Sequence, residues 1–419
     1  MGVGVYFCHD AMGFRSTIRL NLEWKSNPLL CEKAVFLAAH PWKRSCGPGP
    51  MTLQPTQSRV ISSKASNERT IMKWDIPPRQ PNFRMAALER QSVLTKPTGA
   101  LGVMEDIAVW LADIQQVEQP QAAPAAAIVF ASDHPVSHLG VSAYPREVTP
   151  MMVINLATGG AAASVLARFN DVLLYVVDVG AEPYPAPTPA ESVQWCRKDV
   201  GGVVGDLVTT DAMDDTALQG SLLAGAQAVD ALPTDTKVLV LGEMGIGNTT
   251  PASAVAAHLL HLPASEMVGP GTGVSGDALQ AKLHLVERAL TRVGSGSSPL
   301  DVLRQLGGRE MAAIVGAMGR AAEKRMAILV DGFIVSSAAL IAVMHDPRVQ
   351  DYMWFAHQSA EPGHARILEN LNAKPVLHAG LRLGEGSGSL TALPLIRAAV
   401  TLHNEMATFE EASVPDRDR

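Results

Sequence analysis

The chain has 419 residues, of which 47% are hydrophobic, 18% charged and 5% aromatic, so it is long enough for a large core and for two or three domains. This composition, with many glycines and prolines, is typical of a globular α/β protein. The formal net charge of −7 gives no reason to expect nucleic acid as a partner.

Signals for export, membrane insertion and disulfide formation are weak. The N-terminus lacks the ordered basic, apolar and small-residue regions of a signal peptide. We expect no apolar run to reach the roughly 18 to 20 residues that span a bilayer. The four cysteines form no CxxC pair, which argues against a disulfide framework or a zinc site. By elimination, a cytoplasmic location is expected.

Residues 1–71 differ from the rest of the chain. They carry nine Lys and Arg residues against four Asp and Glu residues, and they show no sustained helical or strand period. Two interpretations stay open: a targeting presequence, or a translated upstream region with Met72 as the true start. In either case we expect a basic, disordered extension.

From about residue 76, helical and strand patterns alternate. Residues 100–116 have apolar spacings of three and four, which predict an amphipathic helix. Short apolar runs predict strands at 127–132, 175–180, 237–243, 327–333 and 375–383. Helical patterns lie at 159–169, 218–232, 252–260 and 390–406. The alternation predicts a mostly parallel, doubly wound sheet with helices on both faces, in which ligands bind beyond the carboxyl ends of the strands.

A glycine-rich turn, GEMGIGNTTP, follows the strand expected at 237–243. Gly245 and Gly247 let the backbone approach a ligand closely, and Asn248, Thr249 and Thr250 can cap the next helix or donate to an anion. An ordinary glycine turn with a helix cap explains the same pattern.

A second glycine-rich segment spans residues 268–282 and contains GxGxxG at Gly271, Gly273 and Gly276. The preceding stretch is a poor strand, and no acidic residue follows at the spacing of a dinucleotide fold. A backbone cradle for phosphate therefore fits better than a dinucleotide site, with Lys282 supplying a positive charge.

A third segment, LRLGEGSGS, places Glu385 between glycines after the run expected to be a strand. A carboxylate held there would face the ligand crevice with few bulky neighbours, although an exposed loop glutamate is an equal alternative. Ser359 and Glu361 precede another helix and predict an anion or sugar contact, or equally a capping box.

Asp133, His134 and His138 follow the first strand. No third ligand with metal spacing accompanies the histidines, so a turn with capping roles is favoured over a metal site.

Together these segments resemble one family, the nicotinate-nucleotide–dimethylbenzimidazole phosphoribosyltransferases. Matching stretches run in family order from about residue 76 to 408 and include KPTGALGVME, FASDHPV, GEMGIGNTTPA, GPGTGV, SAEPGH and GLRLGEGSGS. The resemblance implies a six-stranded Rossmann-like parallel sheet at 125–388, and a homodimer. It also implies a small helical domain from both chain ends, at 76–120 and about 389–412.

The resemblance also implies residue roles. Glu385 matches the general base and Glu243 a second active-site carboxylate. The nucleotide side would comprise Gly245, Gly247, Asn248, Thr249, Thr250, Gly271, Thr272, Gly273, Lys282, Asp331 and Ser359. The base side would comprise Ser142, Met244 and Leu383. Departures from the family pattern fall at Pro135, Pro150 and Pro270 and in the stretch after 180, mainly on the base side.

The implied reaction moves the phosphoribosyl group of nicotinate mononucleotide to 5,6-dimethylbenzimidazole or a related base, releasing nicotinate and forming α-ribazole 5′-phosphate. Nicotinate leaves as a neutral ring nitrogen, so we expect neither a metal nor a cofactor. A nicotinamide-dependent oxidoreductase and a non-catalytic binder of the base or its riboside are the alternatives. A pure binder has no need of the two glutamates.

Overall fold

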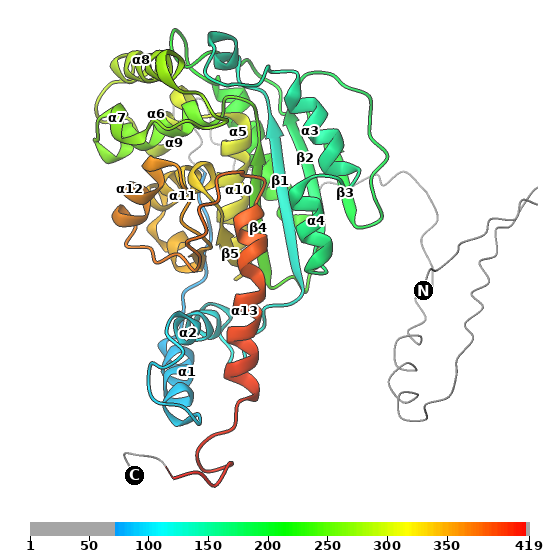
Figure 1. Ribbon diagram of the computed structural model, residues 1–419, viewed down its shortest axis with the longest axis vertical. Coiled ribbons are helices and arrows are strands. Elements are labelled where there is room, and N and C mark those ends of the chain that lie inside the picture. The colour runs from blue at the N-terminus through cyan, green and yellow to red at the C-terminus, as the bar shows by residue number, and fades with distance from the viewer. Residues whose placement is uncertain (1–71, 416–419) are drawn as a thin grey trace, which may run out of the picture. The chain divides into compact units, whose positions relative to one another are not determined.

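Residues 72–415 are described by a computed structural model (Figure 1). The extension expected at 1–71 lies outside the described residues. Six strands form one parallel sheet in the order β3-β2-β1-β4-β5-β6, so the six-stranded Rossmann-like sheet is confirmed. The strands are β1 (Ala125–Ser132), β2 (Leu173–Gly180), β3 (Val193–Arg197), β4 (Val238–Met244), β5 (Ala327–Val330) and β6 (Met353–Phe355).

The strand order reverses between β1 and β4, which makes the carboxyl ends of these two strands the switch point where doubly wound sheets bind ligands. Every residue of β1 is buried, as expected for a central parallel strand covered on both faces. The predicted strands at 127–132, 175–180 and 237–243 correspond to β1, β2 and β4.

The strand predicted at 375–383 is wrong. Within the described residues it forms one isolated bridge, between Leu377 and His357, and a few further backbone hydrogen bonds to residues 355–360. Pro375 cannot donate to a ladder, and His378 to Gly380 are exposed, so the run does not enter the sheet. Strands β3 and β6 were not predicted, because β3 carries polar residues at the sheet edge and β6 has only three residues.

Helices cover both faces of the sheet (Figure 1). Helices α3, α4 and α13 pack on one face and α5 and α10 on the other. The helices are α1 (Pro81–Val93), α2 (Val103–Gln115), α3 (Val148–Ala157), α4 (Ala162–Phe169), α5 (Asp215–Asp230), α6 (Thr249–Leu260), α7 (Ala264–Met267), α8 (Gly276–Arg292), α9 (Pro299–Leu306), α10 (Arg309–Glu323), α11 (Phe333–His345), α12 (Pro362–Asn370) and α13 (Ser387–Glu405), with 3-10 turns η2 (Pro135–Leu139) and η3 (Pro347–Tyr352).

Helices α5 and α10 cross with their backbones in contact. A Cβ atom added to Gly225 of α5 would overlap the carbonyl oxygen of Ala313, and one added to Gly316 of α10 would overlap that of Leu222. The two glycines thus set the distance between α5 and α10, and α10 itself packs on β1.

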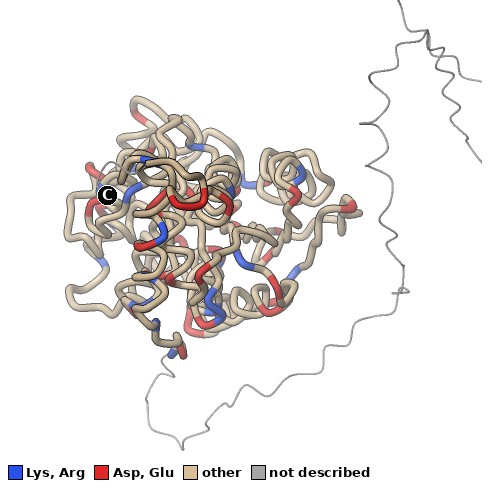
Figure 2. The backbone as a smooth tube through the Cα atoms, turned by 90° about the horizontal axis from the view of Figure 1, so that it is seen from below, with Lys and Arg blue, Asp and Glu red and all other residues tan. Residues whose placement is uncertain are grey.

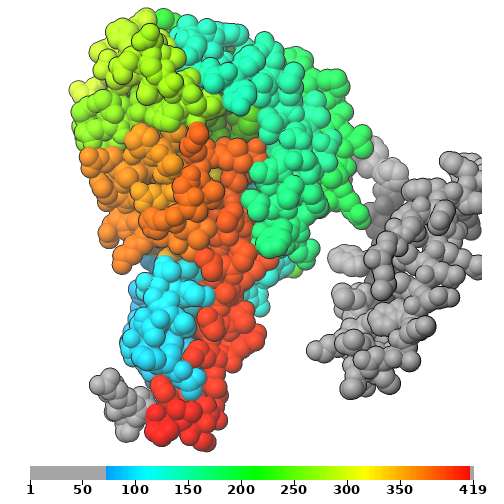
Figure 3. Space-filling model, in the orientation of Figure 1, coloured from blue at the N-terminus to red at the C-terminus, as the bar shows by residue number. Residues whose placement is uncertain are grey.

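The two ends of the described chain meet in a small helical region formed by α1, α2 and the end of α13 (Figures 1 and 3). Backbone hydrogen bonds join Thr95 to Ala407 at 3.0 Å and Phe409 to Val93 at 2.9 Å. This arrangement supports the boundaries that we propose for the small domain, 76–120 and about 389–412. Acidic and basic residues are interspersed along the backbone in Figure 2.

Residues 148–169 form an apolar stretch of 22 residues with the length and hydropathy of a membrane span, which the sequence reasoning overlooked. The chain folds there as two helices, α3 and α4, separated at residues 158–161. Of the most apolar window, 39% is buried inside the protein. Both helices pack against the sheet or its neighbours, so the apolar character of this stretch serves the core at least in part.

Candidate active site

The carboxyl end of β4 and the distant turn that carries Glu385 pack closely against each other. A Cβ atom on Gly242 would overlap the carbonyl carbon of Glu385, and one on Gly384 would overlap Oε1 of Glu243. The amide of Glu385 donates to the carbonyl of Glu243 at 3.3 Å. Because Gly242 and Gly384 have no side chains, the two segments can approach closely enough to bring the two predicted catalytic glutamates together.

Glu385 lies in this turn with a φ of 63°, in the left-handed region that few non-glycine residues adopt. Its side chain is buried, and Oε2 accepts a hydrogen bond from the backbone amide of Ala163, in the first turn of α4, at 3.2 Å. Burial raises the pKa of Glu385, with a further increase from the charge of Asp331 and an opposing effect of the Ala163 amide. The site thus holds a basic carboxylate.

Glu243 is fully enclosed, and the side-chain amide of Asn248 donates to its Oε2. Burial, followed by the charges of Asp331, Glu310 and Glu385, raises the pKa of Glu243 well above its ordinary value. The protonated form of Glu243 is therefore favoured. Asn248 is the N-cap residue of α6, but its side chain orients Glu243 and does not cap the helix.

A buried ion pair supports the turn that follows Glu243. His134 Nε2 lies 2.9 Å from Oε1 of Glu310, and Ser132 Oγ donates to the other carboxylate oxygen. Burial lowers the pKa of His134, but the charge and hydrogen bond of Glu310, together with the charge of Asp133, raise it overall. His134 and the Ser132 hydroxyl lower the pKa of Glu310 despite burial. A Cβ atom on Gly245 would lie 3.1 Å from the His134 ring, so the imidazole packs directly under the glycine turn.

Sequence reasoning missed Glu310, because a single acidic residue in the first turn of an amphipathic helix carries no distinctive signal. The turn predicted at Asp133 and His134 is present after β1, but the capping role is wrong: His134, at the N-cap of η2, makes no capping hydrogen bond, and Asp133 accepts the distant Glu182 amide at 2.6 Å. Within residues 72–415, no group of three or more His, Cys, Asp or Glu side chains is arranged to hold a metal ion.

Lys282 lies entirely beneath the second glycine-rich segment. Its ammonium donates to Thr249 Oγ1 at 2.8 Å and to the carbonyl of Gly269 at 2.9 Å. Burial lowers the pKa of Lys282 to about 8, against the opposing effect of Glu361. Because its side chain has no exposed area, Lys282 supports the segment from behind.

Residues 269–273 connect the nucleotide side to the two other parts of the site. Arg382, three residues before Glu385, donates to the carbonyl of Gly271 at 3.1 Å. Thr272 Oγ1 lies 2.9 Å from Ser142 Oγ and accepts the amide of Ala143 at 3.0 Å. The predicted nucleotide, base and catalytic segments are therefore in mutual contact.

Among the remaining predicted nucleotide residues, Asp331 and Ser359 are buried. Asp331 accepts the amide of Ser389, at the start of α13, at 2.8 Å. Ser359 Oγ accepts the amide of Glu361 at 3.3 Å. Thr250 is fully buried, and its hydroxyl has no hydrogen-bond partner among the described residues.

The predicted base residues are more open. Met244 and Ser142 are half-buried, and the Leu383 side chain is 60% exposed. Gly247 and Gly273 both have positive φ values, 92° and 114°, which suit tight turns beside a ligand.

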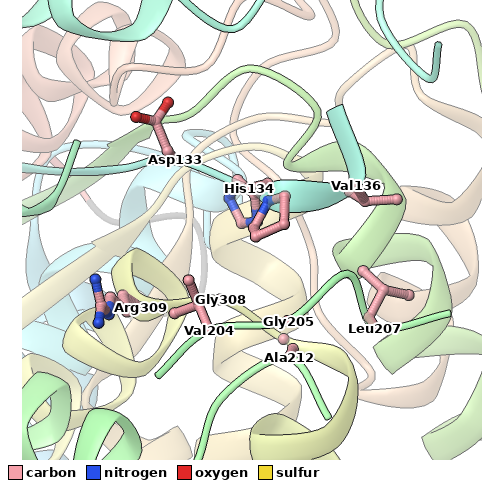
Figure 4. Close-up of a pocket in the computed structure, with 11 residues that line it drawn as sticks. Asp133, His134, Val136, Val204, Gly205, Leu207, Ala212, Gly308 and Arg309 are labelled. Carbon is pink, nitrogen blue, oxygen red and sulfur yellow. The ribbon is translucent and has the colours of Figure 1, made fainter. Parts of the chain in front are cut away.

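A small cavity behind the His134 turn has room for about one water molecule (Figure 4). Its lining includes His134, Gly308, Arg309 and the loop residues Val204, Gly205, Leu207 and Ala212. It is too small for a nucleotide. A larger groove of about 540 Å³, lined by residues including Arg79 and Trp354, lies at the amino end of β6. Parallel sheets bind ligands at the opposite edge, where the glutamates converge.

Comparison with known proteins decides the family. Residues 76–414 match a family model described as phosphoribosyltransferase. The nicotinate-nucleotide–dimethylbenzimidazole phosphoribosyltransferase of Azotobacter vinelandii is 46% identical over 335 residues, covering 80% of this chain and 94% of that protein. The chain belongs to this family. The enzyme of the same name from Bradyrhizobium diazoefficiens is 46% identical over 344 residues, covering 80% of this chain and 95% of its own.

Two solved structures from Thermus thermophilus extend the family match to the fold. One is described as CobT and the other as nicotinate-nucleotide–dimethylbenzimidazole phosphoribosyltransferase, with TM-scores of 0.74 and 0.75. Each is 39% identical and covers 80% of this chain and 99% of its own. The dinucleotide alternative is wrong, because α7 and not a strand precedes the GxGxxG segment.

Proposed function

We propose that the protein transfers the phosphoribosyl group of nicotinate mononucleotide to 5,6-dimethylbenzimidazole or a related base, releasing nicotinate and forming α-ribazole 5′-phosphate. The buried Glu385 carboxylate carries this proposal, since it is held in a strained turn against Glu243 and next to the glycine-rich cradle. The family relatives carry the name of this reaction.

In the reaction, one ring nitrogen of the base attacks the anomeric carbon of the ribose. The bond to the nicotinate ring nitrogen breaks, and its electron pair returns to that ring. The second ring nitrogen of the base gives its proton to Glu385. Attack opposite the leaving group inverts the anomeric carbon and yields the α-nucleotide. General-base catalysis typically contributes about 10²- to 10⁴-fold to the rate.

Glu243 has a complementary role in this proposal. In its protonated form it adds a hydrogen-bond donor beside Glu385 without a second negative charge. This division between two neighbouring carboxyl groups is a common way to separate acid and base roles. The enclosure of Glu243 and its carboxylate neighbours supports the assignment.

The phosphate and ribose would bind along the first turn of α6 and residues 269–273. At the start of α6 the amide of Thr250 already donates to the carbonyl of Gly247 at 3.0 Å, and Pro251 has no amide hydrogen. The positive end of the helix dipole therefore favours an anion there more than free amides do. Thr249 Oγ1 accepts its hydrogen bond from Lys282, so its own hydrogen is available for a phosphate oxygen. We assign the nucleotide side to Gly245, Gly247, Asn248, Thr249, Gly271, Thr272, Gly273, Asp331 and Ser359, with Lys282 behind them.

The base would lie against Ser142, Met244 and Leu383. The exposure of Leu383, and of Tyr144 at 56%, leaves this side of the site open. We also propose a homodimer, in which a second copy shields part of this surface. Sedimentation equilibrium should give twice the chain mass at micromolar concentration, whereas a single-chain mass would contradict the dimer. The cytoplasmic location stays a prediction.

The test is incubation with nicotinate mononucleotide and 5,6-dimethylbenzimidazole, followed by chromatography and NMR of the anomeric proton. We expect nicotinate and the α-anomer in equal amounts, with no nucleotide product when the base is omitted. Adenine and substituted benzimidazoles, supplied in parallel, would define the preferred base. A β-anomer, or tight NADH binding without transfer, would contradict the proposal.

A further inference from the structure

Glu361 is the N-cap residue of α12, yet its side chain makes no capping hydrogen bond. The capping-box alternative is therefore wrong. Its Oε1 reaches across to the second glycine-rich segment and accepts the backbone amide of Gly271 at 3.0 Å. The side chain is only 4% exposed. The buried carboxylate of Glu361 thus occupies the Gly271 amide, a donor in the segment that we expect to bind an anion.

The groups around this carboxylate are those that an anion seeks. A Cβ atom on Gly271 would lie 2.6 Å from Thr249 Oγ1 and 3.2 Å from the ammonium of Lys282, so a hydroxyl and an ammonium group lie beside the residue whose amide Glu361 accepts. The second carboxylate oxygen of Glu361 is buried and has no hydrogen-bond partner among the described residues. No ion pair within 4 Å joins Glu361 to Lys282 in residues 72–415.

We propose that Glu361 is an internal stand-in for the ligand phosphate, holding the Gly271 amide in the free protein and yielding it when an anion binds. The inference rests on the proposed function, since the phosphate of the nucleotide is the anion expected there. Ionised Glu361 repels that phosphate, so its charge limits the affinity of the cradle and makes it depend on pH.

The direction of this pH dependence follows from the groups that face Glu361. Burial raises the pKa of Glu361, and the charges of Lys282 and Arg382 oppose that increase. His364, on the first turn of α12, has a pKa of about 3 because of burial and stays neutral. As pH rises through the Glu361 pKa, the carboxylate gains charge and anion binding weakens. Lys282, with a pKa of about 8, loses its charge only at higher pH.

Sulfate is a suitable probe, because its charge is constant across this range. Calorimetric titration of the full-length protein between about pH 5 and about pH 7 should show the sulfate Kd rising about tenfold, which corresponds to ~1.4 kcal/mol. In Glu361→Gln, which still accepts the Gly271 amide, the Kd should be independent of pH and lower than in the unchanged protein at pH 7. An unchanged slope, or weaker or undetectable sulfate binding in Glu361→Gln at pH 7, would overturn the proposal.

Two further measurements protect the test. Glu266 lies on the neighbouring α7 and forms an exposed ion pair with Arg366. Glu266→Gln removes the same charge as Glu361→Gln but should leave the pH dependence of the sulfate Kd unchanged. If Glu361→Gln does not fold, proton uptake by the unchanged protein still tests the proposal. Sulfate binding near pH 6 should take up protons when measured in buffers of different ionisation enthalpy, and absent uptake overturns the proposal. Loss of transferase activity with a normal sulfate slope would refute only the proposed function.

Discussion

Glu385 and Glu243 share one backbone contact but differ in their surroundings. Glu385 has an amide donor at Ala163, and the charge of Asp331 raises its pKa. The charges of Asp331, Glu310 and Glu385 all raise the pKa of the buried Glu243. Because like charges close together cannot all ionise, the proton belongs on Glu243. The pair therefore offers one base and one neutral donor at the same pH.

Replacing Glu385 with Gln should lower kcat by about 10²- to 10⁴-fold, because the proton acceptor is lost while the shape is kept. The KM for nicotinate mononucleotide should change by less than about threefold, since the cradle is intact. In the unchanged enzyme, kcat should fall as pH drops through the raised Glu385 pKa, and the variant should lack this acid limb. Steady-state kinetics from about pH 5 to about pH 8 provides the check, and near-normal turnover in the variant would refute the role of Glu385.

Replacing Glu243 with Gln should stabilise the protein at neutral pH. The pKa of Glu243 is higher in the folded protein than in the unfolded chain. The contribution of this carboxyl group to the free energy of unfolding is therefore greatest below the unfolded-state pKa, and it falls as pH rises toward the folded-state pKa. A neutral amide avoids that loss, which is on the order of 1 kcal/mol per pKa unit. Urea denaturation should show a higher free energy of unfolding for the variant at pH 7 and no gain at pH 4.

At the scale of single residues, the glycine-rich segments predicted site residues. Single polar side chains outside those segments did not stand out as site residues. Glu385, Glu243 and the glycines of the cradle stand in distinctive segments, and they converge as expected. Glu310 stands in a segment of ordinary composition. Arg382 lies in the third glycine-rich segment, but its partner was not predicted. The partners, Ser132 and His134 for Glu310 and Gly271 for Arg382, lie more than a hundred residues away in the chain. Such contacts depend on tertiary packing, which local patterns do not encode.

At the scale of elements, the crossing of α5 and α10 positions the His134–Glu310 pair. Glu310 is in the first turn of α10, so any outward shift of this helix would pull the carboxylate away from β1. The glycine contacts permit no such shift without loss of packing. Helix placement here is therefore part of the support for the site.

Gly225→Val should destabilise the protein by about 2 to 4 kcal/mol, because three added carbons would overlap the backbone of α10 at Ala313. Gln219→Val, on the exposed face of the same helix, carries the same β-branched residue and should cost less than about 1 kcal/mol. Thermal unfolding of both variants separates overpacking from helix propensity. Equal changes in Tm would show that the crossing tolerates the larger residue.

Central strands were predictable and edge strands were not. β1, β2 and β4 are continuous apolar runs because both faces are covered. The run at 375–383 has similar hydrophobicity, but its proline and glycine leave it as a loop along the ligand edge. That error changed the expected local structure before Glu385 but not its location, since loop and strand deliver the residue to the same edge.

At the scale of the whole molecule, the family match begins at residue 76 and the relatives are covered almost completely without the first 71 residues. The described chain is anchored from its first residues. His345 Nε2 donates to the carbonyl of Met72 at 2.7 Å, and the Trp74 ring packs edge-on against His345 at 5.1 Å.

A chain that begins at Met72 should keep the Tm and the turnover of the full chain, because these anchors are retained. A chain that begins at Pro81 loses Trp74 and Ile76, both buried, and should be less stable by about 3 kcal/mol or more. Calorimetry and the transfer assay on both truncations provide the measurement. A loss of turnover in the chain that begins at Met72 would assign a role to residues 1–71.

The glycine contact between Gly242 and the Glu385 turn has an evolutionary consequence. The contact is made by backbone atoms, so any residue larger than glycine at these positions would overlap the facing turn. Substitutions in the reactive centre should therefore be strongly disfavoured. Leu383, adjoining the turn but open to solvent, is under no such restriction. Selection for new acceptor bases should therefore enrich replacements at Leu383 and Ser142 and leave Gly242 and Gly384 untouched.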